Sequence, residues 1–131
     1  MAEPTTTSGI ISKPTAGTVD QAVARLTALV AAKGMMVFAV IDHSGEARRR
    51  GLDLRDTKVV IFGSPTGGTP VMEAAPLAAL DLPLKVLVWD DLGHTTLSYL
   101  DPAVLAERHR LDAELATRLV GIGPLTDELA S

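Results

Sequence analysis

Apolar residues recur every three to four positions over residues 18–33, which is the clearest pattern in the chain. This spacing is typical of a helix that buries one face. Thr18 and Gln21 stand at the positions of a capping box, where each side chain bonds the other residue's main-chain N–H. Gly34 follows at the position of a left-handed C-terminal cap. The pattern therefore predicts a helix over residues 18–33.

Three short runs are apolar at nearly every position and rich in β-branched residues: 35–41, 58–62 and 83–91. Such runs predict strands. The first is expected to be covered on both faces, or covered on one face with a partner on the other. The third leads through turn residues 91–93 into 95–100, which predicts a β-hairpin.

The segments around these runs are less regular. Residues 1–9 predict a flexible N-terminal tail, because they are small and polar with nothing to pack. Residues 10–13 predict a short strand. Residues 69–83 predict one or two short helical turns, interrupted at Pro76.

The last part of the chain predicts one more helix. Asp101 and Pro102 provide an acidic N-cap and a proline at the first helical position. An apolar stripe continues to about residue 120, and Gly121 is expected to end it. With a hairpin in the middle and helices near the ends, residues 10–131 are expected to form a single α+β domain.

Composition narrows the possible functions. The 131 residues are 47% hydrophobic but only 3% aromatic, so the core must be aliphatic. The chain has no cysteine and therefore no disulfide, thiol nucleophile or thiolate metal site. The net charge of −4 is opposite to that of a typical nucleic-acid-binding domain. The arginines at 48–50 fit a solvated turn better than a polyanion site.

The distribution of apolar residues along the chain also bears on where in the cell the protein is expected. No apolar stretch approaches the roughly 20 residues of a membrane span. The first residues have neither a basic leader nor an apolar run of signal-peptide length. We expect a cytoplasmic protein without a membrane partner.

Polar residues cluster after the first apolar run. His43 could act as a general acid or base, because only its unperturbed pKa lies near neutrality. Asp42 or Glu46 could orient it, and Ser44 lies beside it. The alternative is a turn of incidental polarity, because these residue types also favour turns. No metal site is expected, since the three histidines have no metal-ligand spacing.

The stretch GSPTGGTP, residues 63–70, lies between an apolar run and a helix-like segment. Gly63 and Gly68 have the spacing of a phosphate-binding loop, but Thr69 and Pro70 stand in place of the lysine and the hydroxyl residue. The main-chain N–H groups of residues 67–69 could still hold an anion. The alternative is a tight strand-to-helix turn in which the glycines serve only the backbone.

Three longer stretches resemble the bacterial Domain of Unknown Function 302 family: TVDQAVARLTALVAAKGMMVFAVIDHSGEA, IFGSPTGGTPVMEAAPLAALDLPLKVLVWDD and LSYLDPAVLAERHRL. The resemblance runs from Thr18 to Leu111. It implies a curved, largely antiparallel sheet with helices packed on one face, similar to the TATA-binding-protein arrangement. It carries over no established activity, and the cofactor stays unknown. Relatives usually have Asn at the positions of Ser64 and Leu100, so a ligand could differ here.

Three hypotheses follow. The first is a domain that binds a small molecule or anion in a pocket at one end of the sheet. The second is an enzyme that uses His43 as general acid or base, and the third is a homodimeric interaction module. Convergence of the candidate residues on one pocket would favour the first two. The candidate ligand-binding residues are Asp42, His43, Gly63, Ser64, Gly67, Gly68, Thr69, Lys85, Arg108 and His109. A homodimer is expected.

Overall fold

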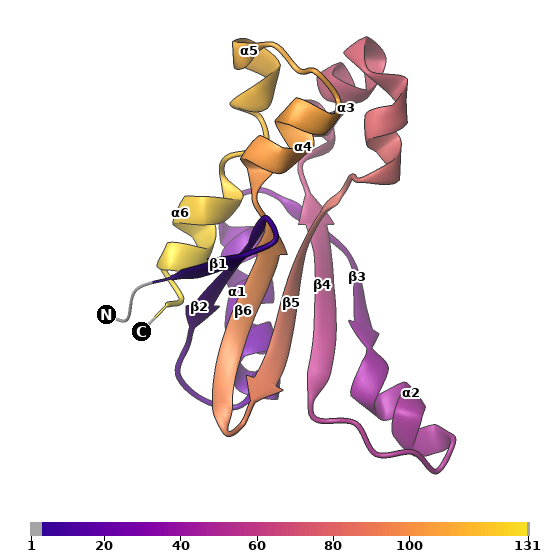
Figure 1. The fold of residues 1–131 in the computed structure, drawn as a ribbon, viewed down its shortest axis with the longest axis vertical. Coiled ribbons are helices and arrows are strands. Elements are labelled where there is room, and N and C mark those ends of the chain that lie inside the picture. Colours follow the sequence, from indigo (N-terminus) through magenta and orange to yellow (C-terminus); the bar gives the residue numbers. More distant parts are fainter. Residues whose placement is uncertain (1–3, 131) are drawn as a thin grey trace.

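The computed structural model describes residues 4–130 and contains a six-stranded antiparallel sheet with the strand order β1-β2-β6-β5-β4-β3 (Figure 1). The strands are β1 (Thr5–Thr7), β2 (Ile10–Pro14), β3 (Met36–Asp42), β4 (Thr57–Gly63), β5 (Leu84–Asp91) and β6 (His94–Leu100). The helices are α1 (Val19–Ala32), α2 (His43–Arg49), α3 (Pro65–Ala74), the 3-10 helix η1 (Pro76–Leu80), α4 (Pro102–Arg108), α5 (Ala113–Ala116) and α6 (Ile122–Asp127). The predicted α+β fold is confirmed.

Helix α1 covers the inner face of the sheet, behind the strands in Figure 1. The capping box of Thr18 and Gln21 is present, with both reciprocal hydrogen bonds. Gly34 has φ +74° as predicted, a conformation that costs a residue without a side chain little. The core joins α1 and α6 to β4, β5 and β6; its fully buried members include Leu26, Val30, Val60, Phe62, Val86, Val88 and Leu97.

The predicted hairpin is the centre of the sheet. Pairing of Asp91 with His94 leaves a two-residue turn, in which Leu92 has φ 51° and Gly93 has φ 92°. Two successive positive φ angles are typical of the type I′ turn, whose twist matches that of antiparallel strands. His94, expected in the turn, is the first residue of β6.

The N-terminal segment differs from the expected flexible tail. Residues 5–7 form β1, which pairs with β2 through Thr7↔Ile10. Ser8 and Gly9 both have positive φ, so a second two-residue turn folds the chain back onto the sheet. Residues 1–3 lie outside the described part of the chain.

Strand β3 is not covered on both faces. It is the edge strand of the sheet beside β4, and Met36, Phe38, Val40 and Ile41 are each 40–51% exposed. An apolar run of this kind does not distinguish a central strand from an apolar edge, because both are rich in β-branched residues.

The single helix expected over residues 101–120 is instead two short helices, α4 and α5, and α6 follows them. Arg110 adopts φ 51°, and the N–H of Leu111 donates to the carbonyl of Ala106 at 2.9 Å. This is the bonding pattern of a Schellman motif, which ends α4. Asp112 then caps α5, and Gly121 begins α6 instead of ending a helix.

Candidate functional site

The candidate residues of the sequence fall at opposite ends of the sheet. Helix α2, which begins at His43, lies at one end, whereas α3, α4 and α5 lie at the other (Figure 1). Asp42 and His43 therefore do not share a site with the glycine stretch over residues 63–68.

Asp42 is the N-cap of α2, a helix that the sequence analysis missed and read as a turn. Its Oδ1 atom accepts hydrogen bonds from the N–H of Gly45 and the hydroxyl of Ser44, both at 2.9 Å. The bond from Gly45, followed by that from Ser44, holds the pKa of Asp42 below its ordinary value of 3.8. The buried Ser44 hydroxyl also accepts from the N–H of Thr57 at 3.1 Å, which joins α2 to β4.

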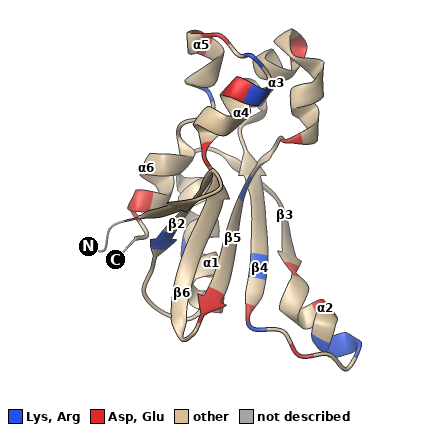
Figure 2. Ribbon diagram, viewed as in Figure 1, with Lys and Arg blue, Asp and Glu red and all other residues tan. Residues whose placement is uncertain are grey.

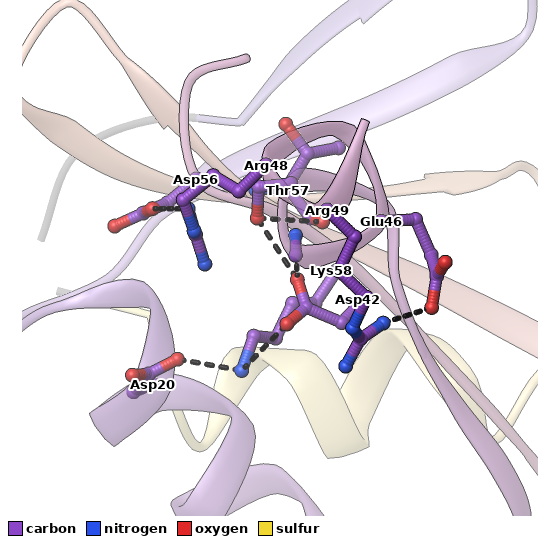
Figure 3. A network of polar contacts seen from close by, with 10 residues as sticks. Asp20, Asp42, Glu46, Arg48, Arg49, Asp56, Thr57 and Lys58 are labelled. Atoms are coloured by element: carbon purple, nitrogen blue, oxygen red, sulfur yellow. Dashed lines mark hydrogen bonds and ion pairs between the residues drawn. The ribbon is translucent and has the colours of Figure 1, made fainter. Parts of the chain in front are cut away.

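His43 is exposed at the first position of α2. No side-chain hydrogen bond or ion pair among residues 4–130 involves its imidazole. The carboxylates expected to orient it have other partners, since Asp42 caps the helix and Glu46 pairs with Arg49 (Figure 3). The structure therefore gives His43 no orienting group.

Charged side chains around α2 form ion pairs (Figure 3). The ammonium of Lys58 lies 2.7 Å from Asp20 and 3.9 Å from Asp42. The hydrogen bond to Asp20 is the main cause that raises the pKa of Lys58 above its ordinary value. Arg48 and Arg49 form a basic tip on α2, as Figure 2 shows, and both are exposed as expected.

The glycine stretch is part of a helix and not a loop. Ser64 caps α3, accepting from the N–H of Gly67 at 3.2 Å, and its carbonyl accepts from the N–H of Gly68 at 2.8 Å. Two of the N–H groups proposed to hold an anion are thus used by the first turn of α3. Thr69 is exposed on the same helix. The cap function tolerates either Ser or Asn at position 64.

A cavity of about 230 Å³, here called the end cavity, lies beside this helix start, beyond the ends of β4 and β5. Gly63, Ser64, Gly67 and Gly68 form part of its wall. The rest is mostly apolar and comes from the strands β3, β4 and β5, from α3 and from the segments that lead into β5 and α6: Met35, Phe38, Phe62, Met72, Leu82, Pro83, Leu84, Leu119 and Ile122. Arg118 provides the positive charge of this lining. Four predicted residues thus meet at one cavity, together with Arg118, which the sequence analysis did not select.

A second cavity, of about 370 Å³, opens where β5 and β6 separate. We call it the strand gap. The two strands pair from Asp91↔His94 to Leu87↔Ser98 and no further, and they diverge towards α3 and α4 in Figure 1. Lys85 lines this gap, and so does Leu100, where the resemblance led us to expect Asn.

Arg108 and His109 meet at Asp81, a residue that the sequence analysis missed. The His109 Nε2 atom lies 2.6 Å from one carboxylate oxygen of Asp81, and Arg108 donates to both oxygens at 3.1 and 3.2 Å. The hydrogen bond with His109 is the main cause that lowers the pKa of Asp81, and Arg108 adds to it. Asp81 lines the strand gap. No local pattern marks it, because its partners lie on a helix 27 and 28 residues later.

No three histidine or acidic side chains among residues 4–130 are grouped so that they could hold a metal ion. None of the helices in this range has both the length and the apolar character that a membrane crossing requires.

The chain is similar to known proteins in both its sequence and its fold. The profile of the family described as "Domain of unknown function DUF302" matches residues 11–123. A crystal structure of an uncharacterized conserved DUF302 protein from Bacillus stearothermophilus has a TM-score of 0.80 and 18% identity, and the match covers 94% of this chain and 97% of that one. This likeness shows the fold alone.

Curated relatives with higher identity come from Brucella. Proteins of Brucella suis and Brucella abortus named "Fluoride-specific ion channel FluC 1" are 36% identical to this chain over 124 residues, 91% of its length. The match covers 49% and 46% of those proteins, respectively. The chain therefore spans about half the length of the curated relatives it matches.

Proposed function

Because the chain belongs to the DUF302 family, whose name states no activity, we propose a function from its cavities: the domain binds a small, mostly apolar molecule with one negative charge in the end cavity. The observation that carries this proposal is the meeting of Gly63, Ser64, Gly67 and Gly68 around an apolar space.

The size and lining of the end cavity support a compact apolar ligand. Its volume of about 230 Å³ exceeds the roughly 150 Å³ of an apolar cavity that already admits benzene. Met35 and Met72 supply flexible thioether side chains, which adapt to ligands of different shape. Glycines at 67 and 68 leave the wall open where side chains would otherwise project.

Arg118 supports the negative charge. Arg118 lines the end cavity, and its guanidinium forms no ion pair or side-chain hydrogen bond with the other described residues. A guanidinium presents several donors in a plane and suits a carboxylate. A benzene ring that bears a carboxylate combines the two features and serves as the probe.

The test is a titration with sodium benzoate, followed by the backbone amide signals in two-dimensional NMR. We expect saturable shifts at Gly63 and Gly68, and weaker binding by Arg118→Met. Gly68→Leu should abolish binding, because its side chain would extend beside Met72 into the cavity. Thr69→Leu is the matched control on the exposed side of α3. Binding that survives in Gly68→Leu, or an absence of shifts at both glycines, would contradict the proposal.

A homodimer is the second part of the proposed function, and the edge strand β3 supports it. Its exposed Met36, Phe38, Val40 and Ile41 form an apolar edge without a charged residue before Asp42. Such an edge pairs readily with another strand. We expect β3 of two copies to pair antiparallel. Val40→Lys should give a monomer in sedimentation velocity, whereas Val120→Lys, at an exposed site outside the sheet, should not. Equal masses for both variants would count against this interface.

A role beside a fluoride channel is a further candidate, favoured by the identity with the Brucella proteins across most of this chain. In this proposal the domain modulates channel activity carried by the rest of such proteins. The test uses vesicles that contain the part of the Brucella suis protein that lies outside the match with this chain. Fluoride efflux from these vesicles should change when this chain is added. Unchanged fluoride efflux at a saturating concentration of this chain would exclude this role.

The enzyme alternative with His43 stays a prediction and gains no support from an exposed imidazole that no carboxylate orients. His43→Ala should therefore leave benzoate binding unchanged. The cytoplasmic location also stays a prediction.

A further inference from the structure

The strand gap has features that a ligand in the end cavity does not use. Strand β5 continues to Leu84 along β4, and β6 continues to Leu100 along β2. Between β5 and β6, however, the pairing stops at Leu87↔Ser98. The same register would next bring Val86 opposite Tyr99 and then Lys85 opposite Leu100, and neither pair is formed.

The main-chain groups of Lys85 and Leu100 face the gap. On β5, the N–H of Asp90 donates to Asp56 on the β4 side at 2.9 Å. Because successive residues of a strand point their N–H and C=O groups to opposite sides, Lys85 points towards β6. On β6, the N–H of Asp101 donates to Gly9 on the β2 side at 2.8 Å, so Leu100 points towards β5. The gap is therefore bordered by main-chain donors and acceptors that do not pair with each other.

Tyr99 contributes a buried polar group. It is only 5% exposed and lines the gap. No side-chain hydrogen bond among residues 4–130 involves its hydroxyl. Because every fully buried side-chain nitrogen or oxygen in this part of the chain has a partner, this hydroxyl is not fully buried. Tyr99 packs in the core with Val86 and Leu97, so it borders the gap on the inner face of the sheet, opposite the face that carries Lys85.

The charge around the gap favours an anion. Lys85 is exposed, and its ammonium has one described contact, with the carbonyl of Pro83 at 3.5 Å. The carboxylate of Asp81 is already paired with Arg108 and His109. Lys85 is therefore the cation of the gap that remains available for a ligand.

The rest of the lining is aliphatic: Ile10, Val59, Leu84, Leu87, Leu105 and Ile122. The volume of about 370 Å³ lies in the range of small-molecule sites, roughly 300–1,000 Å³. A ligand with a long aliphatic part and one anionic end would satisfy both the lining and the donors.

We propose that the strand gap binds an aliphatic monocarboxylate of medium chain length. The carboxylate accepts hydrogen bonds from donors at the gap, which include the Lys85 ammonium and main-chain N–H groups of the strand ends. The chain lies against the aliphatic side chains between β5 and β6. This site is separate from the end cavity, although Leu84 and Ile122 contribute to both walls.

The test is an NMR titration with sodium octanoate, with 1-octanol and octylamine as uncharged and cationic analogues. We expect saturable shifts at the amides of Lys85, Leu87 and Leu100, and markedly weaker binding of both analogues. Lys85→Met should weaken octanoate binding about tenfold, in line with the loss of one charge-assisted hydrogen bond.

Arg118→Met is the matched control, because Arg118 lines the end cavity and not the gap. It should leave octanoate binding unchanged. Shifts confined to Gly63 and Gly68, with binding lost in Arg118→Met, would overturn the strand-gap site and support the end cavity. Equal binding of octanol and octanoate, or an absence of shifts at the gap, would also overturn it. These last two results would leave the prediction of benzoate binding in the end cavity unchanged.

Discussion

The imidazole of His109 lies 2.6 Å from the carboxylate of Asp81, although 28 residues separate the two in the chain. His109 caps the C-terminus of α4, and Asp81 follows η1. The contact therefore fastens the helices at one end of the molecule to the start of β5. Asp81 retains 23% side-chain exposure, and His109 only 9%.

This contact predicts a specific dependence of stability on pH. The pKa of Asp81 is lowered by folding, so its ionised form stabilises the fold above the unfolded pKa of about 3.9 and loses this effect as the pH falls through the folded value. Asp81→Asn should therefore cost about 1 kcal/mol at pH 7 and much less below pH 3. Urea unfolding at both pH values measures the difference. Asp53→Asn is the exposed control, and an equal cost of Asp81→Asn at both pH values would refute the assignment.

Ser44→Ala tests the anchor of α2. Ser44 is 1% exposed and bonds both the carboxylate of Asp42 and the N–H of Thr57. Its loss leaves the main-chain group of Thr57 without this partner, which should lower the free energy of unfolding by about 1–3 kcal/mol. Hydrogen exchange should rise first in α2. Glu46→Gln, on the exposed face of the same helix, should change stability little; equal effects of the two variants would contradict this role for Ser44.

Thr126→Val tests how the buried Lys13 is stabilised. The Lys13 ammonium donates to the Thr126 hydroxyl at 2.7 Å and to the carbonyl of Gly123 at 3.0 Å, and it lies 2.8 Å from Asp127. Valine keeps the shape of threonine but removes the acceptor, so we expect a loss of about 1.5–3 kcal/mol, typical of a bond to a charged group. Thermal unfolding provides the measurement. Thr117→Val is an exposed control, and a Tm unchanged in Thr126→Val would show that this bond is dispensable.

Leu92→Asn should stabilise the protein. Leu92 is 88% exposed and has φ 51°, a conformation that costs a branched side chain about 1–2 kcal/mol. Asparagine is enriched in this conformation, particularly before glycine in a type I′ turn. We expect a gain of about 0.5–1 kcal/mol, visible as a higher Tm. Leu77→Asn, an exposed change without positive φ, should give no gain; a lower Tm for Leu92→Asn would show that the leucine makes a contact that matters.

The sequence was most informative where a signal depends on neighbouring residues. The capping box of Thr18 and Gln21, the cap at Gly34 and the turn at residues 92–93 are all confirmed, because each is a local arrangement of a few residues. Local signals were also misleading. The apolar stripe after Pro102 suggested one helix, but Arg110 turns into the left-handed region and ends it.

The candidate site was predicted only in part, for the same reason. The residues at 63–68 share a cavity because they follow one another in the chain. Asp81 and Arg118 acquire their surroundings only when distant segments meet, and no short pattern records such meetings. His43 stood out by its chemistry, yet folding leaves it exposed at the other end of the sheet.

The sequence by itself thus determined helix α1, the central hairpin, the aliphatic core and the α+β class, because periodicity and capping are properties of neighbouring residues. Only the tertiary structure decided that β3 is an edge, that β5 and β6 separate beyond Leu87↔Ser98, and that Tyr99 and Lys85 face the resulting gap. These features depend on which strands pair and where the pairing stops. Long-range packing sets both, and no single segment of the chain encodes it.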